Sequence, residues 1–444
     1  MTAPTARIAG EESARDQGLA RGVGLWSFTF SILNGVVGAG IVALPASMAA
    51  AAGGYAPFAY LAVALVMAAV VVCFAEGGSR VPTSGGAYGT VEAAFGKGAG
   101  FLAGIYMWLA SVLACGGIAA ALCDALGALV PALAGVGPRL AILLLILGGI
   151  SWINVRSAGL AAGVIAWGTV IKLVPLGLFV AVGGLALLVG HDPAPAAVAP
   201  QGGHFSEAML LALFAFCGME TPLGASGEVA DPTRTVPRAT ILAMLCVLVL
   251  YVAIQVVAQG LLGAALAGSA EPLADGMRQI SPALGLVLLA GGILSRFVWI
   301  GSDVLGAPRV LFAFARDGML PAWLGAAHPR FATPHIAIWV HSAIAFALAA
   351  TGTFTRLAIL STLATAGLYF LACAAALVLR RRGVAILGTP LSFRILPLAA
   401  GMGMASMVVL VAIARIDEIL AFVGLTFASL ALYAVMRPRI ARAA

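Results

Sequence analysis

Long apolar runs separated by short polar or charged clusters repeat along the whole chain. Many runs are long enough to cross about 30 Å of hydrocarbon as a helix. Reading each run between its breaker and charge clusters predicts twelve membrane-spanning helices, and the chain is expected to be an all-α membrane protein. The predicted spans are 24–50, 54–79, 99–130, 139–153, 159–189, 205–228, 238–264, 281–314, 333–350, 356–379, 394–414 and 417–436.

Two of these spans contain residues that interrupt a helix. The first span holds the stretch NGVVGAGIVALPA (34–46), and the sixth lies within ALFAFCGMETPLGASGEVADPTRTVPRA (212–239). An interior Gly costs about 1 kcal/mol relative to Ala and Pro about 3 kcal/mol, and lipid cannot satisfy the freed backbone groups. The interrupting residues are Gly35, Gly38, Gly40 and Pro45 in the first span, and Gly218, Glu220, Pro222 and Gly224 in the sixth.

The offset of five spans between the two breaks predicts an inverted repeat, since an odd offset reverses the orientation of the second copy. Breaks in corresponding helices of such repeats build a binding site near the middle of the membrane. The predicted organisation is a cytoplasmic tail (1–23), a first repeat (24–190), a second repeat (205–380), two further helices (394–437) and a cytoplasmic tail (438–444).

Unwound backbone suits a zwitterionic ligand. Amide N–H groups at the start of a half-helix attract a carboxylate, and exposed carbonyls accept hydrogen bonds from an ammonium group. Glycine lets the ligand approach the backbone closely. The sequence therefore predicts a site for an amino acid, or for an amine derived from one.

Composition and charge agree with a membrane protein. Of 444 residues, 62% are hydrophobic and 9% are charged, whereas a soluble protein carries about 25% charged residues. Eighteen of the 24 Lys and Arg residues fall on one predicted side, four on the other, and two within spans. The positive-inside rule then places both termini in the cytoplasm, and we expect a multi-pass protein of the cell inner (plasma) membrane. The polar N-terminus lacks the apolar core of a signal peptide.

Little in the sequence indicates an enzyme. The six Cys are scattered singly, and the five His fall in loops or near span ends without ligand spacing. There is no Walker motif, so no ATPase is built into the chain. We expect no metal and no cofactor, and as partners an amino acid or amine, the lipid bilayer and no nucleic acid. Proton coupling and a homodimer are left open.

Four motifs carry a resemblance to a known family. They are GVVGAGIVALPA, FAEGGSRVPTSGGAYGTVEAAFG (74–96), the sixth-span stretch, and PRVLFAFARDGMLPAWL (308–324). Together they resemble the amino acid–polyamine–organocation (APC) transporter superfamily. The chain is similar to the arginine/agmatine antiporter and to the L-type and cationic amino acid transporters. The resemblance implies the leucine-transporter fold, with a 5+5 inverted repeat of the first ten of twelve transmembrane helices, and helices 1 and 6 broken.

The resemblance also implies roles for individual residues. The amides of Ala39 and Gly40, next to Gly38, would bind the substrate carboxylate. Carbonyls from both breaks would bind its amine. An aromatic gate would close over the bound substrate, and an acidic residue beside Gly218 would contribute to binding and gating. The carbonyls belong to Val36, Phe214 and Cys217, the gate is Phe214, and the acid is Glu220.

Three further charges lie within the predicted spans. Lys172 lies about 20 Å into its span at 1.5 Å per residue, too deep for its side chain to reach water. It is either a proton-carrying substitute for a coupling cation or a static cation bonded to a broken helix. Arg296 and Asp303 share one face of the eighth span. Either Asp303 attracts a cationic side chain and Arg296 belongs to an outer gate, or the two neutralise each other.

The predicted function is secondary active transport of amino acids by alternating access. The substrate is expected to be a cationic amino acid or its amine, exchanged as in the arginine/agmatine antiporter. The alternative is a proton-coupled symporter of neutral amino acids that uses Lys172. A channel would need a pore-lining ring or filter, and none is evident.

Overall fold

The computed structural model describes residues 23–81, 86–156, 172–190, 205–223, 229–386 and 389–443. Within these ranges the chain is helical, with one isolated bridge between Val23 and Val229 as its only extended pairing. The α-helices are α2 (Leu25–Val36), α3 (Leu44–Ala52), α4 (Ala56–Arg80), α5 (Gly86–Phe95), α6 (Lys97–Leu129), α7 (Val136–Arg156), α9 (Gly184–Val189), α10 (Phe205–Phe216), α11 (Glu220–Leu223), α12 (Pro232–Leu262), α13 (Pro272–Arg278), α14 (Pro282–Gly306), α15 (Pro308–Arg316), α16 (His335–Thr351), α17 (Phe354–Arg381), α18 (Leu396–Ala412) and α19 (Ile416–Ala443).

The helices follow the predicted apolar runs. In the described part of the chain, nine helical stretches are long and apolar enough to cross a membrane, and three shorter apolar helices accompany them. The first part of the fifth predicted span, 159–171, lies outside the described residues. Its remainder, Lys172–Val189, is helical and contains a π-helical turn at Phe179–Gly183. The protein is therefore a multi-pass helical membrane protein.

Proline and glycine set many helix ends. Pro occupies one of the first two positions of α4, α12, α14 and α18, where its missing N–H has no intrahelical acceptor to lose. Gly263 follows the end of α12 with a positive φ, which glycine adopts without strain. These residues let the chain turn sharply between neighbouring helices.

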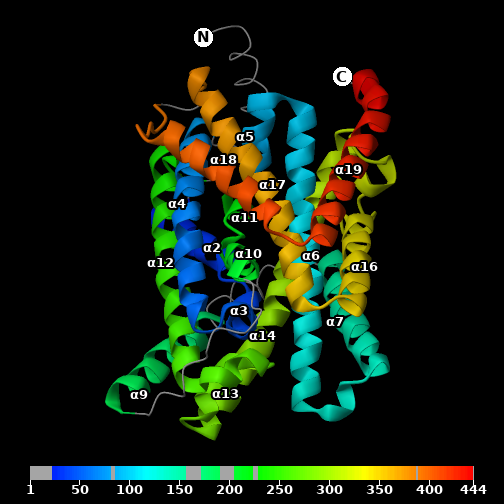
Figure 1. Cartoon of the computed structure of the whole chain (residues 1–444). Coiled ribbons are helices and arrows are strands. Elements are labelled where there is room, and N and C mark those ends of the chain that lie inside the picture. Colours follow the sequence, from blue (N-terminus) through cyan, green and yellow to red (C-terminus); the bar gives the residue numbers. More distant parts are fainter. Residues whose placement is uncertain are drawn as a thin grey trace.

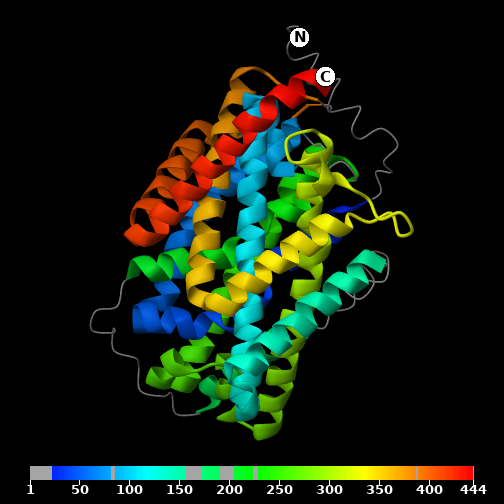
Figure 2. The ribbon, with the colours of Figure 1, turned by 90° about the vertical axis from the view of Figure 1, so that its right-hand side faces the viewer.

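The helix α6 runs through the interior of the bundle (Figure 2). In the most apolar 18-residue stretch of α6, 78% of the residues are buried, whereas in the corresponding stretch of α19 only 6% are buried. The α19 helix is therefore left to face lipid. Glycines allow close packing along α6: a Cβ at Gly104 would clash with the Phe314 ring, and one at Gly116 would lie 2.8 Å from Leu348 Cβ. These two glycines of the third predicted span therefore serve helix packing.

The bundle has two distinct ends (Figure 1). At one end lie α5 and the C-terminal part of α19, and we call it the α5 end. At the other lie α9 and α13, and we call it the α13 end. The α3 helix lies part of the way between them.

Candidate functional site

The first predicted helix break is confirmed. The α2 helix ends at Val36, and Gly38 is extended, with φ −79° and ψ 171°. The chain resumes as a short 3₁₀-helix, Ala39–Val42, before α3 begins at Leu44. The first amides of this 3₁₀-helix, at Ala39 and Gly40, have no acceptor within the helix they begin.

The second break is confirmed as well. The α10 helix ends at Phe216, and a short helix, α11, begins at Glu220. Between them Gly218 has φ 113°, a conformation that side-chain-bearing residues rarely adopt. The last residue predicted to interrupt this span, Gly224, lies outside the described residues.

The two breaks touch each other through bare backbone. A Cβ placed on Gly218 would lie 2.5 Å from the carbonyl oxygen of Gly35, and one placed on Gly35 would lie 2.8 Å from the carbonyl oxygen of Gly218. Both distances are shorter than any real Cβ contact, so each position requires glycine. Two segments separated by more than 180 residues thus form one joined break.

A cavity of about 450 Å³ adjoins this joined break. Residues of α6, α14 and α17 complete its wall, and it extends towards the α5 end as far as Tyr88 and Arg309. The predicted site residues that line it are Val36, Gly38, Gly40, Lys172, Phe214, Cys217, Gly218, Glu220 and Asp303. Arg296 is not part of the lining.

The carbonyls predicted to bind an amine differ in their surroundings. The Val36 carbonyl accepts hydrogen bonds from Tyr251 Oη at 2.9 Å and from the Gly38 N–H at 2.7 Å. The Phe214 carbonyl accepts one from the Cys217 N–H at 3.2 Å. A carbonyl oxygen has two lone pairs, so an amine at Val36 would have to displace a protein donor.

The Phe214 ring lies against the first break. A Cβ at Gly40 would lie 2.8 Å from Phe214 Cε1. On another side the ring makes an edge-to-face contact with Phe354 of α17, with centroids 5.9 Å apart. The ring therefore bridges the 3₁₀-helix and α17, where a change of its rotamer would open or close the space beside Gly40.

Lys172 joins the fifth predicted span to the first break. Its Nζ donates a hydrogen bond to the Asn34 carbonyl at 2.8 Å. Asn34 lies in the last turn of α2, where carbonyls have no intrahelical donor and a cation is favoured. No carboxylate among the described residues lies within 4.0 Å of this buried ammonium group.

Glu220 binds the backbone of its own break. Its Oε2 accepts hydrogen bonds from the Gly218 N–H at 3.0 Å and from Tyr369 Oη at 2.8 Å. Tyr369 belongs to α17, so the buried carboxylate ties α11 to that helix. Movement of either helix would disturb both bonds.

Arg296 and Asp303 are not partners of each other. Arg296 Nη1 lies 2.7 Å from Glu271 Oε1, and Arg296 is 1% exposed. Glu271 immediately precedes α13, so this ion pair links α14 to the start of α13. Burial raises the pKa of the Glu271 carboxyl above its usual value, and the Arg296 charge opposes that rise.

Asp303 instead meets side chains from two other helices. Ser111 Oγ of α6 donates to its Oδ1, and His341 Nε2 of α16 lies 2.9 Å from its Oδ2. Trp108 Nε1 donates to His341 Nδ1 at 3.2 Å. His341 is fully buried within α16, so the prediction that every His falls in a loop or near a span end is wrong for this residue. A lone His inside an apolar run needs a polar partner, so its position in the sequence could have indicated a buried hydrogen-bonded group.

Cys115 Sγ also approaches this group, so that donor atoms of Cys115, Asp303 and His341 all lie within 4.8 Å of one another. A metal bound through His Nε2 normally leaves an N–H on Nδ1 that donates to an acceptor. Here Trp108 presents a donor to Nδ1 instead. The arrangement therefore fits a hydrogen-bonded group better than a metal centre.

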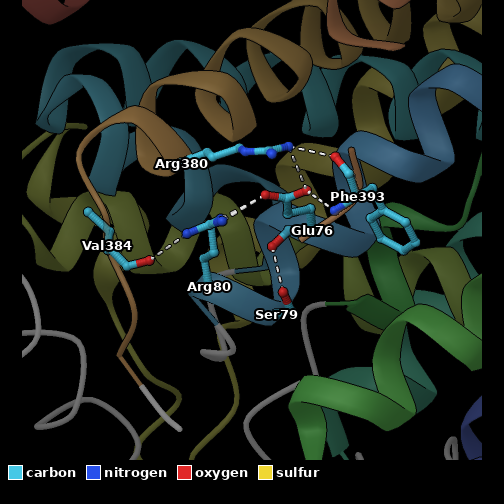
Figure 3. A network of polar contacts seen from close by, with 6 residues as sticks. All are labelled: Glu76, Ser79, Arg80, Arg380, Val384 and Phe393. Carbon is cyan, nitrogen blue, oxygen red and sulfur yellow. Dashed lines mark hydrogen bonds and ion pairs between the residues drawn. The ribbon is translucent and has the colours of Figure 1, made fainter. Parts of the chain in front are cut away.

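A second polar network lies at the α5 end (Figure 3). Buried Glu76 of α4 pairs with Arg80 at 2.7 Å and with Arg380 of α17 at 3.7 Å, and it accepts the Phe393 N–H at 2.9 Å. Arg380 and Arg80 also donate to carbonyls of the segment that joins α17 to α18. The network clamps this connection onto the end of α4.

The fold and the paired breaks are those of a multi-pass membrane transporter. The chain belongs to the amino acid permease family, whose model matches residues 23–436, and so to the APC superfamily. It is 24% identical over 389 residues to the branched-chain amino acid permease BcaP of Bacillus subtilis, covering 83% of this chain and 82% of that one. It is 29% identical over 383 residues to the serine/threonine exchanger SteT of Bacillus subtilis, covering 83% and 85%. An uncharacterized transporter of Mycobacterium tuberculosis, Rv1999c, is 32% identical over 339 residues, covering 75% and 74%.

Proposed function

We propose that the protein is a secondary transporter that moves amino acids across the cell inner membrane by alternating access. The observation that carries the proposal is the joined break, with Gly35 against Gly218, beside a cavity of about 450 Å³. Two half-helices at one site offer amide and carbonyl groups to the two ends of a zwitterion. Relatives named as amino acid permeases and exchangers support the same substrate class.

The proposed topology has twelve crossings and a 5+5 inverted repeat, with both termini in the cytoplasm. The breaks lie five predicted spans apart, which supports the repeat. In this topology the α5 end faces the cytoplasm, since Arg80 and Arg380, in the last turns of α4 and α17, belong to the polar network at that end. The cavity that reaches Tyr88 and Arg309 would then open inward.

The contacts favour neutral amino acids, moved together with a proton. In the described chain Lys172 Nζ donates to the Asn34 carbonyl, so losing its proton would remove the charge that strengthens this bond to the first break. Such a bond would make the shape of the break depend on whether Lys172 is charged. The carboxylate of Glu220, by contrast, already accepts bonds from the Gly218 N–H and from Tyr369 Oη.

Exchange of cationic amino acids or their amines is the second candidate. Two acidic side chains, Glu220 and Asp303, line the cavity, and no Lys or Arg nitrogen lies within 4.0 Å of either in the described chain. A cationic side chain would relieve this negative charge.

Reconstituted transport separates the two candidates. Purified protein in liposomes would be tested with a radiolabelled amino acid panel, with and without internal amino acid and with an inward proton gradient. Uptake of neutral amino acids into empty vesicles that follows the proton gradient is the expected result. Uptake of arginine or agmatine that requires internal substrate would establish the exchanger, and no uptake of any amino acid would refute the proposed function.

The variant Lys172→Gln tests the coupling group. Glutamine keeps a hydrogen-bond donor for the Asn34 carbonyl but cannot carry a proton. We expect substrate binding to persist and the dependence of uptake on pH to be lost. Unchanged pH dependence would leave Lys172 as a structural cation, and Lys172→Met, which also removes the donor, would report that structural role.

A further inference from the structure

Asp303 is held by a chain of hydrogen bonds whose direction can be worked out. An indole N–H is only a donor, so Trp108 makes His341 Nδ1 an acceptor. A neutral imidazole with an acceptor at Nδ1 carries its proton on Nε2. That nitrogen therefore donates to Asp303 Oδ2, at 2.9 Å. Ser111 donates to the other carboxylate oxygen, and the thiol of Cys115 also bonds to this carboxylate, so all three side chains give hydrogen bonds to Asp303.

This arrangement keeps Asp303 an acceptor towards the cavity. A carboxylate has about four acceptor positions, and the three protein donors use at most three of them. Asp303 lines the cavity, and in the described chain no Lys or Arg nitrogen lies within 4.0 Å of it. The wall at this point thus presents at least one unused lone pair, which costs free energy when an apolar group covers it.

The position of Asp303 relative to the first break limits the kind of donor that can reach it. Trp299 lies one turn earlier on the same face of α14, about 6 Å along the axis. A Cβ on Gly38 would lie 3.0 Å from Trp299 Nε1, so the indole of Trp299 packs against the first break. We take the one-turn separation of Trp299 and Asp303 as the approximate reach that a ligand bound at the break needs. A serine hydroxyl is too close to Cα for this, whereas the end of a glutamine side chain is not.

We propose that His341 and Trp108 are positioning residues that orient the Asp303 carboxylate, and that Asp303 selects substrates whose long side chain ends in an N–H donor. The proposal rests on the proposed transport of amino acids and names the preferred side chain. The donor can be a neutral amide, as in glutamine, or a cation, as in lysine. Aliphatic side chains such as that of leucine are disfavoured, because they would cover the carboxylate without a hydrogen bond.

The test measures kcat/KM in liposomes for glutamine, lysine and leucine. The variants are His341→Leu, which removes the donor to Asp303, His341→Gln, whose amide can replace it, and Trp108→Phe. Ser342→Ala is the control, since Ser342 is a buried polar neighbour on α16 that bonds to Ser151 and not to Asp303.

We expect the wild type to prefer glutamine or lysine to leucine by at least about tenfold, the lower end of the range for one mismatched side-chain group. His341→Leu should reduce that ratio mainly through KM for the donor-bearing substrate, with His341→Gln restoring most of it. Trp108→Phe should lower the ratio less, and Ser342→Ala should leave it unchanged.

Three results would overturn the proposal. The first is a wild-type protein that transports leucine as well as glutamine and lysine. The second is a His341→Leu variant that loses all substrates equally, and the third is a His341→Gln variant no better than His341→Leu. Each of these leaves amino acid transport itself intact, whereas absence of uptake for every amino acid would refute the proposed function instead. Comparing kcat/KM for glutamine with kcat/KM for lysine also shows whether the site prefers a neutral N–H donor or a cation.

Discussion

Replacement of Gly218 by alanine tests the joined break most directly. Gly218 has φ 113°, and a backbone held in such a sparsely populated region costs about 1–3 kcal/mol for a residue with a side chain. The new Cβ would also lie 2.5 Å from the Gly35 carbonyl oxygen, and an overpacked contact of this kind costs about 1–3 kcal/mol more. Since about 1.4 kcal/mol corresponds to a factor of ten, the two effects together predict a loss of at least tenfold.

That loss can fall on stability or on substrate affinity, because the clash is relieved only by separating the two breaks. We therefore expect Gly218→Ala to lower the Tm in detergent, or to weaken substrate binding at least tenfold, or both. Thermal unfolding followed by size-exclusion chromatography measures the first, and binding of a radiolabelled substrate identified in the liposome panel measures the second.

Gly301→Ala is the matched control. Gly301 lies within α14, and a Cβ there would meet no atom within 4 Å outside its own helix. Alanine in a helix interior is favoured by about 1 kcal/mol, so this variant should be neutral or slightly stabilised. A Gly218→Ala protein with wild-type Tm and wild-type affinity would refute the contact between the breaks as the basis of the site.

Three further variants test other parts of the molecule. Phe214→Ala should impair occlusion more than equilibrium binding, so bound substrate should dissociate faster in a filter-binding chase. A loss of equilibrium affinity without faster dissociation would argue against a gate. Glu76→Gln should destabilise by about 3–5 kcal/mol, because it leaves two guanidinium groups without their buried carboxylate, whereas Asp124→Asn at an exposed ion pair should cost about 0–1 kcal/mol. Thermal unfolding compares the two, and equal effects would contradict the role of burial. Lowering the pH through the interval between the ordinary and the raised pKa of Glu271 protonates the folded form first, so the contribution of Glu271 to the free energy of unfolding rises as the pH falls. The free energy of opening of α13, taken from hydrogen exchange after correction for the intrinsic rates, should therefore rise as the pH falls through this interval. Glu271→Gln, which cannot titrate, should abolish that dependence on pH; an unchanged dependence would assign it to another group.

The sequence predicted the breaks well because Gly and Pro carry a local free-energy cost that a long apolar helix would otherwise avoid. It could not predict that Gly35 and Gly218 touch, since that contact depends on how two distant helices cross. The position of Lys172 in a span was evident from its depth, but its acceptor, the Asn34 carbonyl, was not. Local patterns thus located the residues of the site, and tertiary packing chose their partners.

The same limit explains the treatment of Arg296 and Asp303. Their spacing correctly placed both on one face of α14, yet the partner of each comes from elsewhere in the chain. Glu271 lies beyond the end of a span and His341 in the middle of another, and no periodicity links either to α14. Spacing along a helix predicts which side chains share a face, but it says nothing about the residues that the face meets.

The contact between Gly35 and Gly218 also restricts how this protein can change by mutation. When a side chain overfills a core, a neighbour can usually be made smaller to restore the volume. Here each new Cβ would strike a backbone carbonyl, and a carbonyl cannot be shortened by any substitution. Damage at either glycine therefore has no compensating change at the other. We expect selections for suppressors of Gly218→Ala to return true revertants, or substitutions that shift whole helices, and not a replacement at Gly35.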